Sequence, residues 1–283
     1  MGLFSGMEKF GLKNVDEKKL YEKQEAPVEK KKEVVKPQAS AEPEESFLFP
    51  KKYNCPVCSS EITSLTVKSS KVRMIGSDMD LRPRYQQMDA TKYDVVLCPK
   101  CGYANIAKNF PMVMPAHRKL IIDNISKTFH YDNPNGPIYS YDEAITRYKI
   151  ALSNAMVKSA KDSEKAYICL KMAWVIRGKS ESLEPSMPDY EDAMEECKVD
   201  ERGALQLARD GFVNARATED FPLAGMDEPT VDYLISALSV ELDDPKTAAK
   251  LLSNIIVSKT ANSRVKDRAR DLMATVKKML EEA

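Results

Sequence analysis

The sequence holds little of what common catalytic motifs are built from. Its 283 residues include two histidines and ten glycines. No stretch matches a Walker phosphate-binding loop, the Gly-x-Gly-x-x-Gly dinucleotide fingerprint or the His-Glu-x-x-His metalloprotease motif. His117 and His130 have no serine or cysteine nucleophile in a recognisable motif beside them. We therefore expect a protein without enzymatic activity, with both histidines at the surface or at helix ends.

An excess of one charge and long apolar runs are missing as well. The 43 basic residues balance 43 acidic ones, so nothing draws the whole chain to nucleic acid or to a membrane surface. No run approaches the ~20 apolar residues that a membrane-spanning helix needs. No secretory signal precedes the cysteines, whose usage suits a reducing compartment. We therefore expect a cytoplasmic protein with no membrane span.

What the sequence does contain is a pair of Cys-Pro-x-Cys motifs. Their four cysteines are Cys55, Cys58, Cys98 and Cys101. Two residues between cysteines allow a tight turn to present both sulfurs to one ion, and two such turns complete a tetrahedral site of four thiolates. Gly102 follows the second motif, where glycine adopts a positive φ most easily, whereas Ser59 stands at the matching place after the first.

These cysteines predict a structural Zn²⁺ site, because all four ligands come from the protein and no position remains for water. Three alternatives stay open: one iron ion in a rubredoxin-like site (Fe, implying electron transfer), a dithiol redox centre, or disulfides. Cys169 and Cys197 fall in helical patterns. There we expect small buried apolar residues rather than ligands.

The segment between the motifs is unusually long. From Cys58 to Cys98 it is roughly twice the ~15–20 residues that usually separate the pairs of a zinc ribbon. Strand formers cluster in it at residues 65–68, 72–75 and 93–97. We expect these strands to return the second motif to the first. Asp78 and Asp80, beside a turn signal, are interpreted as solvated loop carboxylates rather than as a metal site.

Residues 1–45 and 51–110 differ in character. The first stretch is rich in Lys, Glu and Pro, which predicts a disordered tail with a short apolar start at residues 1–12 that either frays or docks.

The segment from residue 51 to 110 contains ten basic residues against five acidic ones, the one hint of nucleic-acid binding. Three tyrosines there could stack on bases: Tyr85, Tyr93 and Tyr103. The interpretation we favour is that a small ribbon has charged faces and needs these aromatic side chains for its thin core.

From Pro115 onward the apolar spacing becomes helical. A capping box opens one helix at residues 140–143, and Asp244 followed by proline opens another. The helices form pairs whose faces alternate small and large apolar residues, which is similar to tetratricopeptide packing; an ordinary helical bundle is the alternative. We expect the large aromatic side chains of this half to be core: Trp174, Tyr167 and Phe212.

Several motifs occur in a telling order. They are Cys-Pro-Val-Cys at 55–58, Ser-Ser-Lys-Val-Arg at 69–73, Asp-Met-Asp-Leu at 78–81, the run from Tyr93 to Ala104, Ala166 to Trp174, and Lys266 to Asp271. This order resembles an uncharacterised bacterial family, domain of unknown function 2225, over nearly everything after about residue 46. The resemblance implies a bacterial cytoplasmic protein with a zinc-ribbon-like head, tetratricopeptide-like helices and no established activity. Ser59 departs from the glycine usual there.

The predicted fold class is α+β, in three parts. Residues 1–45 form a disordered tail, 46–112 a small zinc-ribbon-like β module with four cysteine ligands, and 113–283 an all-α tetratricopeptide-like domain. We expect a zinc-binding, non-enzymatic adaptor whose helical surface binds a protein or peptide partner. Nucleic-acid binding through the basic ribbon and rubredoxin-like electron transfer are the alternatives.

Overall fold

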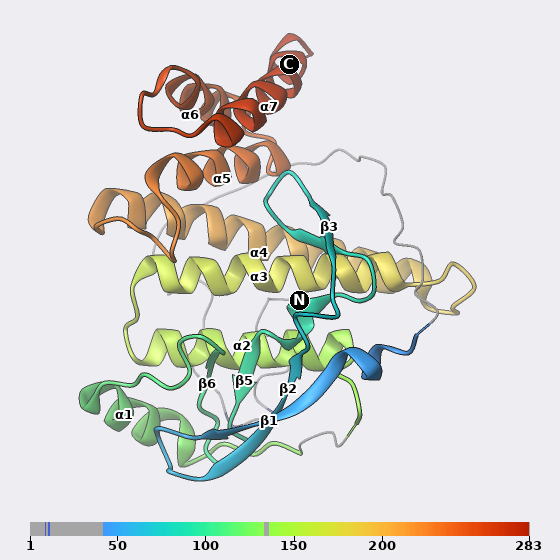
Figure 1. Cartoon of the computed structure of the whole chain (residues 1–283), viewed down its shortest axis with the longest axis vertical. Coiled ribbons are helices and arrows are strands. Elements are labelled where there is room, and N and C mark those ends of the chain that lie inside the picture. The colour runs from blue at the N-terminus through green and yellow to red at the C-terminus, as the bar shows by residue number, and fades with distance from the viewer. Residues whose placement is uncertain (1–8, 10, 12–41, 133–135, 283) are drawn as a thin grey trace.

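The computed structural model of the chain describes residues 9, 11, 42–132 and 136–282. Most of the predicted tail, including nearly all of its apolar start, therefore lies outside the described residues. The remainder is α+β, as predicted: short antiparallel strand pairs come first and seven α-helices follow within the described part. Figure 1 shows two of the strand pairs at one end of the molecule, while the third lies beside the stacked helices.

The strands form three separate antiparallel pairs. They are β1 (Leu48–Asn54) with β2 (Glu61–Val67), β3 (Met74–Ser77) with β4 (Pro83–Tyr85), and β5 (Val95–Leu97) with β6 (Ala104–Ile106). Each cysteine motif occupies a turn, the first between β1 and β2 and the second between β5 and β6. The strand predicted at 93–97 is shorter than expected. Asp89 caps a 3-10 helix, η4 (Ala90–Tyr93), which occupies the start of that stretch.

The helices follow one another in space in the order of the chain. They are α1 (Pro115–Ile121), continued by the π-helical turn η5 (Ile122–Ser126), then α2 (Tyr141–Val157), α3 (Asp162–Ser182), α4 (Tyr190–Thr218), α5 (Glu228–Glu241), α6 (Pro245–Val257) and α7 (Ser263–Glu281). From α2 to α7 each helix packs on the next. Among the described helices, none is both long enough and apolar enough to cross a bilayer.

Both predicted helix starts are confirmed. The Ser140 hydroxyl accepts a hydrogen bond from the Glu143 backbone amide at 3.1 Å, which caps α2. The Asp244 carboxylate accepts one from the Thr247 amide at 3.1 Å, and a proline occupies the first turn of α6. These caps satisfy amides that have no partner within the helix.

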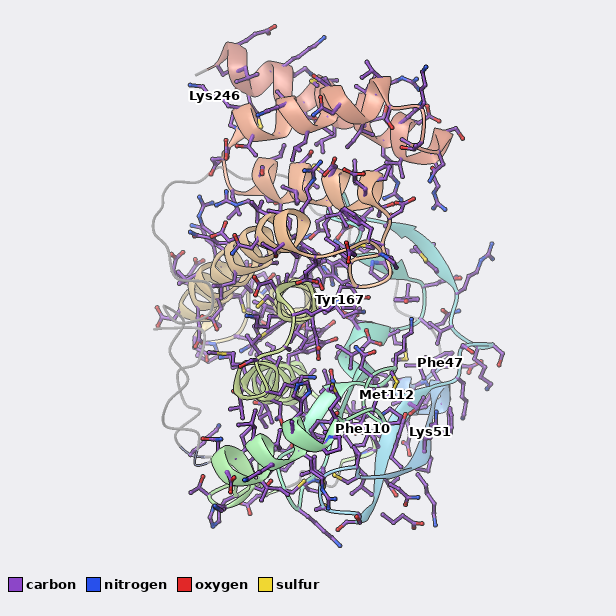
Figure 2. All side chains as sticks on the ribbon, turned by 90° about the vertical axis from the view of Figure 1, so that its left-hand side faces the viewer. Phe47, Lys51, Phe110, Met112, Tyr167 and Lys246 are labelled. Carbon is purple, nitrogen blue, oxygen red and sulfur yellow. The ribbon has the colours of Figure 1, made fainter. Side chains whose placement is uncertain are left out.

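The hydrophobic core is continuous from the strands into the helices. One buried cluster joins the cysteine turns and β5 to α2, α3, α4 and α5, and a second cluster lies among α5, α6 and α7. Trp174 and Phe212 are buried, as expected, while Tyr167 is half-buried. The boundary placed at residue 112 stays a prediction, because apolar side chains on both sides of it share one core. Figure 2 places Phe110 at the strand end and Lys246 at the opposite end of the stack.

The β3–β4 hairpin leaves the other strands and reaches the helices. In Figure 1 it lies alongside the stack at the level of α3 to α5. Met79 and Leu81 at its tip pack against the cluster formed by α5, α6 and α7. Arg268 of α7 donates a hydrogen bond to the Ser77 hydroxyl at 2.6 Å. The long insert between the cysteine motifs is therefore an arm that holds the C-terminal helices.

Candidate metal centre

The two cysteine turns have the same backbone hydrogen bonds. In the first, the Cys55 amide donates to the Ser60 carbonyl at 2.9 Å; in the second, the Cys98 amide donates to the Tyr103 carbonyl at 2.8 Å. The bond extends each hairpin by one rung beyond its strands. Because the turns match, each presents its pair of sulfurs in the same way.

The residue after each motif adopts the same left-handed conformation. φ is 63° at Ser59 and 72° at Gly102, and both amides donate back to the first cysteine carbonyl of their turn, at 2.8 Å and 3.0 Å. Ser59 therefore has the same left-handed backbone conformation as Gly102 in the second turn. This conformation costs an L-residue energy that glycine avoids.

Substitutions at Ser59 and Gly102 are expected to change the free energy of unfolding in opposite directions. Ser59→Gly should raise the free energy of unfolding by about 0.5–1 kcal/mol, since glycine adopts the positive φ without strain. Gly102→Ala should lower it by about 2–3 kcal/mol, because a Cβ there would lie 2.6 Å from the Phe129 ring. Urea denaturation of both variants beside the parent chain measures the two changes. A destabilised Ser59→Gly variant would contradict the matched turns.

The turns bring the four predicted sulfurs together. All four Sγ atoms lie within 4.8 Å of one another. Two of these distances join one turn to the other: Cys55 to Cys101 and Cys58 to Cys98, each at 3.6 Å. Metal–sulfur bonds of ~2.3 Å in a tetrahedron give sulfur–sulfur edges of roughly 3.8 Å, so the cluster fits a tetrahedral ion. Four sulfurs in this arrangement are typical of zinc and of iron alike.

The same distances decide against disulfides in this structure. All six cysteines are free thiols, and 3.6 Å is far longer than the ~2.05 Å of a sulfur–sulfur bond. Three of the four clustered thiols are buried, and Cys58 is the most exposed. Cys169 and Cys197 are buried elsewhere in the helical half, as expected.

Crowding sets the acidity of the clustered thiols. Hydrogen bonds from Cys101 and Cys98 lower the pKa of the Cys55 thiol to about 2. Hydrogen bonds with Cys55 and Cys98 raise the pKa of the Cys101 thiol far above its ordinary value. The Cys101 thiol therefore keeps its proton, and its hydrogen bond stabilises the Cys55 thiolate. A divalent cation at the centre would replace the thiol protons and allow all four sulfurs to ionise.

Helical residues hold both turns from outside. Arg118 of α1 donates to the Val57 carbonyl at 2.8 Å, within the first motif. Two others hold the second motif: Ser126 of η5 donates to the Cys101 carbonyl and Asn154 of α2 to the Gly102 carbonyl, both at 2.8 Å. Sequence reasoning missed all three, because their partners are backbone atoms far away in the chain. They fix the cysteine turns to the first two helices.

The prediction that Asp80 is a solvated loop carboxylate was wrong. Asp80 is 0% exposed. Its carboxylate accepts a hydrogen bond from Trp174 Nε1 at 3.0 Å and lies 3.1 Å from an Arg177 nitrogen, both on α3. The Asp80 carboxylate also accepts a hydrogen bond from the Arg82 backbone amide at 3.2 Å. A buried carboxylate with these partners anchors the insert to α3.

Part of the basic segment points inward. Arg82 is 3% exposed, and both Arg82 and Arg84 bind the Glu181 carboxylate of α3, at 3.0 Å and 2.6 Å. Lys92 is also buried, 2.7 Å from Glu44. These three cations neutralise internal carboxylates, so they do not add to an exposed basic face.

The tyrosines of this segment are also mostly internal. Tyr93 and Tyr103 are buried, as expected of aromatic side chains in a thin core, which leaves them unavailable to stack on bases, while Tyr85 is half-exposed. The histidines agree with expectation: His130 is exposed beyond η5, and His117 is half-exposed in the first turn of α1. Neither histidine belongs to the cysteine cluster.

The sequence of the chain matches a known protein family. The sequence profile described as "Uncharacterized protein conserved in bacteria (DUF2225)" matches residues 48–276. The chain belongs to this family. The DUF2225 match takes in both cysteine turns, the insert and almost every helix, so the cluster and its helical supports fall within one family unit. No curated protein and no solved structure matches the chain.

Proposed function

We propose that the chain is a zinc-binding adaptor of the bacterial cytoplasm, without enzymatic activity. In this proposal a zinc-ribbon-like head is clamped by a structural ion to tetratricopeptide-like helices, whose surface binds a protein or peptide. The observation that carries it is the closed cluster of four sulfurs, within 4.8 Å of one another and braced by helical residues. Catalytic zinc keeps a position for water, whereas structural zinc takes four protein ligands.

The order of the helices supports a binding surface. Helices α2 to α7 pack one on the next, as in proteins whose stacked helices present extended faces to partners. Val199 and Val213 lie about four turns apart on one face of α4, and both are exposed. Exposed apolar side chains on a shared helix face are suited to anchor an amphipathic or extended peptide.

The test begins with protein purified without added metal. We expect one zinc ion per chain and no visible colour. One iron ion per chain with a red, reducible chromophore would contradict the adaptor role and favour electron transfer. Immobilised chain is then exposed to nuclease-treated lysate. A partner retained by the parent chain and by the control Val257→Glu, but lost from a Val199→Glu/Val213→Glu variant, supports the proposal. Val257 is a matched control because it is exposed on a different helix, α6.

Two outcomes would contradict the adaptor. One is a folded, zinc-loaded chain that retains no protein. The other is retention of nucleic acid in untreated lysate with affinity falling steeply as salt rises, which would favour the basic segment as the functional surface.

A further inference from the structure

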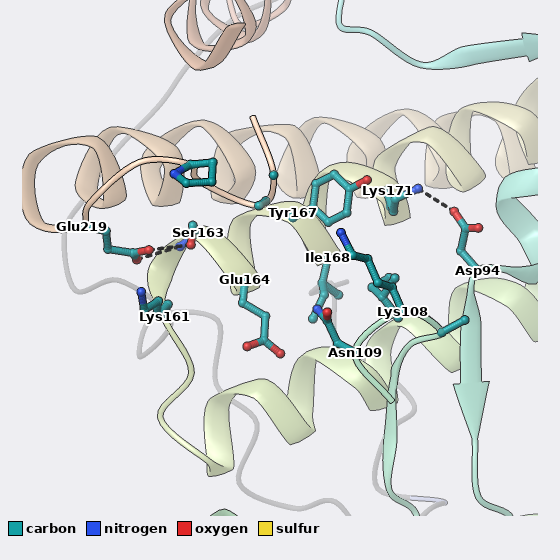
Figure 3. A pocket seen from close by; sticks show the side chains of 15 residues that line it. Asp94, Lys108, Asn109, Lys161, Ser163, Glu164, Tyr167, Ile168, Lys171 and Glu219 are labelled. Atoms are coloured by element: carbon teal, nitrogen blue, oxygen red, sulfur yellow. Dashed lines mark hydrogen bonds and ion pairs between the residues drawn. The ribbon is translucent and has the colours of Figure 1, made fainter. Parts of the chain in front are cut away.

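A cavity of about 530 Å³ opens between the first turns of α3, the segment after β6 and the loop from α4 to α5. Figure 3 shows the side chains that line it. Cavities of ~300–1,000 Å³ are typical of sites for small organic ligands. The cysteine cluster does not line this cavity, so the cavity is a separate feature of the molecule.

Two of the carboxylates that line the cavity are neutralised by ion pairs. Asp94 lies 2.5 Å from the Lys171 ammonium, and Lys171 is buried in the cavity wall. Glu164 lies 2.6 Å from the Lys158 ammonium. Each acid is matched by one base, so neither pair leaves a net charge for a ligand to meet.

The third carboxylate fills one end of the cavity. Glu219 accepts hydrogen bonds from the Ser163 amide at 3.0 Å and from its hydroxyl at 2.5 Å. It thereby caps the first turn of α3 from another part of the chain. A ligand's anionic group is excluded from this corner, because the donors there are already taken.

Two lysines and an amide remain uncommitted. Within the part of the chain that the structure describes, Lys108 and Lys161 form no ion pair, and the side chains of Lys108, Lys161 and Asn109 make no hydrogen bond. In Figure 3 Lys108 extends toward Tyr167 and Ile168, with Asn109 next to it. Among the described residues, the cavity therefore carries two cations without an ion-pair partner, Lys108 and Lys161, against one such carboxylate, Glu219, which leaves one net positive charge. Lys108 lies beside an aromatic ring and an unused amide.

We propose that this cavity binds a small organic anion. Its phosphate or carboxylate group is held by Lys108 and Asn109, and its apolar body lies against Tyr167, Ile168 and Pro222, which line the same space. Ammonium and amide donors together suit an oxyanion, and the ring and aliphatic wall suit an apolar body. The proposal does not depend on the adaptor role.

Phenyl phosphate is the probe, because it joins a dianion to a flat apolar ring. Calorimetry on the full chain, as purified, is expected to show one molecule bound per chain, with inorganic phosphate weaker and phenol without measurable binding. Lys108→Gln should weaken phenyl phosphate at least about tenfold, since a charge-assisted hydrogen bond is lost. Lys246→Gln is the matched control: this exposed lysine lies at the far end of the helical stack, and its variant should bind like the parent.

A second variant tests the apolar wall. Tyr167→Leu should weaken phenyl phosphate more than inorganic phosphate, because the ring that faces the apolar body is removed; the loss of the ring's contact with the Lys171 ammonium, at 5.1 Å, affects both probes. Phenylacetate replaces the phosphate by a carboxylate, and its affinity relative to phenyl phosphate identifies the preferred group. The proposal is overturned if neither probe binds saturably, or if Lys108→Gln and Lys246→Gln weaken binding equally. Thermal melting of each variant separates lost binding from lost folding.

Discussion

Cys98→Ser is expected to lower the free energy of unfolding by about 4 kcal/mol or more and to abolish binding of the proposed ion. The substitution removes one of four ligands from a cluster whose sulfurs lie within 4.8 Å of one another. Metal binding and folding are linked in small cysteine modules, so loss of the ion is loss of folding free energy. Calorimetric melting together with the zinc content of each preparation measures both effects. Cys55→Ser should behave in the same way.

The matched control is Cys169→Ser. Cys169 is as buried as Cys98 but lies on α3, outside the cluster. Its replacement places a hydroxyl in an apolar environment, which should cost about 1–2 kcal/mol and leave the zinc content unchanged. Equal melting of the Cys98→Ser and Cys169→Ser chains would contradict the site.

Loss of the ion should also loosen the helices next to it. Arg118, Ser126 and Asn154 donate to backbone carbonyls of the cysteine turns, so those bonds depend on the turns keeping their shape. Hydrogen exchange of the parent chain before and after chelation is expected to show lost protection in α1 and η5, with α6 unaffected. Lost protection confined to the cysteine turns would show that the clamp does not extend to the helices.

Asp80→Ala is expected to cost about 3 kcal/mol. The carboxylate is fully buried, and its removal leaves Trp174 Nε1 and the Arg82 amide without acceptors and takes one partner from Arg177. Buried donors left unpaired, together with a half-paired buried charge, account for a loss of this size. Urea denaturation measures it. Asp123→Ala is the control, because Asp123 pairs with Lys127 at an exposed site, and its variant should melt like the parent.

Asp80→Asn keeps one acceptor and removes the charge. The amide oxygen can still accept from Trp174, whereas the amide nitrogen then faces the Arg82 backbone amide and the negative charge beside Arg177 is gone. A variant intermediate between the parent and Asp80→Ala is therefore expected. If Asp80→Asn is as stable as the parent chain, neither the ion pair with Arg177 nor the second acceptor oxygen contributes to stability, and the hydrogen bond from Trp174 alone anchors the insert.

The cluster of four cysteines could be predicted from sequence because it depends on local spacing. Each Cys-Pro-x-Cys turn is a short-range feature, and its hydrogen bonds close within six residues, as between Cys55 and Ser60. The helix starts at Ser140 and Asp244 were predictable for the same reason, since a cap and its amide are three residues apart. Helical periodicity likewise identified the buried faces that include Trp174 and Phe212.

What could not be predicted depends on partners far away in the chain. Asp80 looked like an ordinary loop carboxylate because Trp174 and Arg177 follow it by nearly a hundred residues. Arg82 looked like part of a basic surface because its partner, Glu181, is equally distant. A charged residue in a loop is usually solvated. Asp80 and Arg82 are buried instead because the arm packs on α3, a contact that the local sequence does not indicate.

The arm has a consequence for how the chain is made. Its Ser77 hydroxyl accepts a hydrogen bond from Arg268, 191 residues later. A ribosome delivers the cysteine motifs and the arm long before it delivers α7, so the arm emerges with its final partner still unsynthesised. Contacts of such long range form late and slowly. Leu81 also packs against the earlier core cluster, but until the last helix is released Met79 at the tip has no C-terminal cluster to cover it. Apolar surface exposed during this interval favours aggregation of the nascent chain.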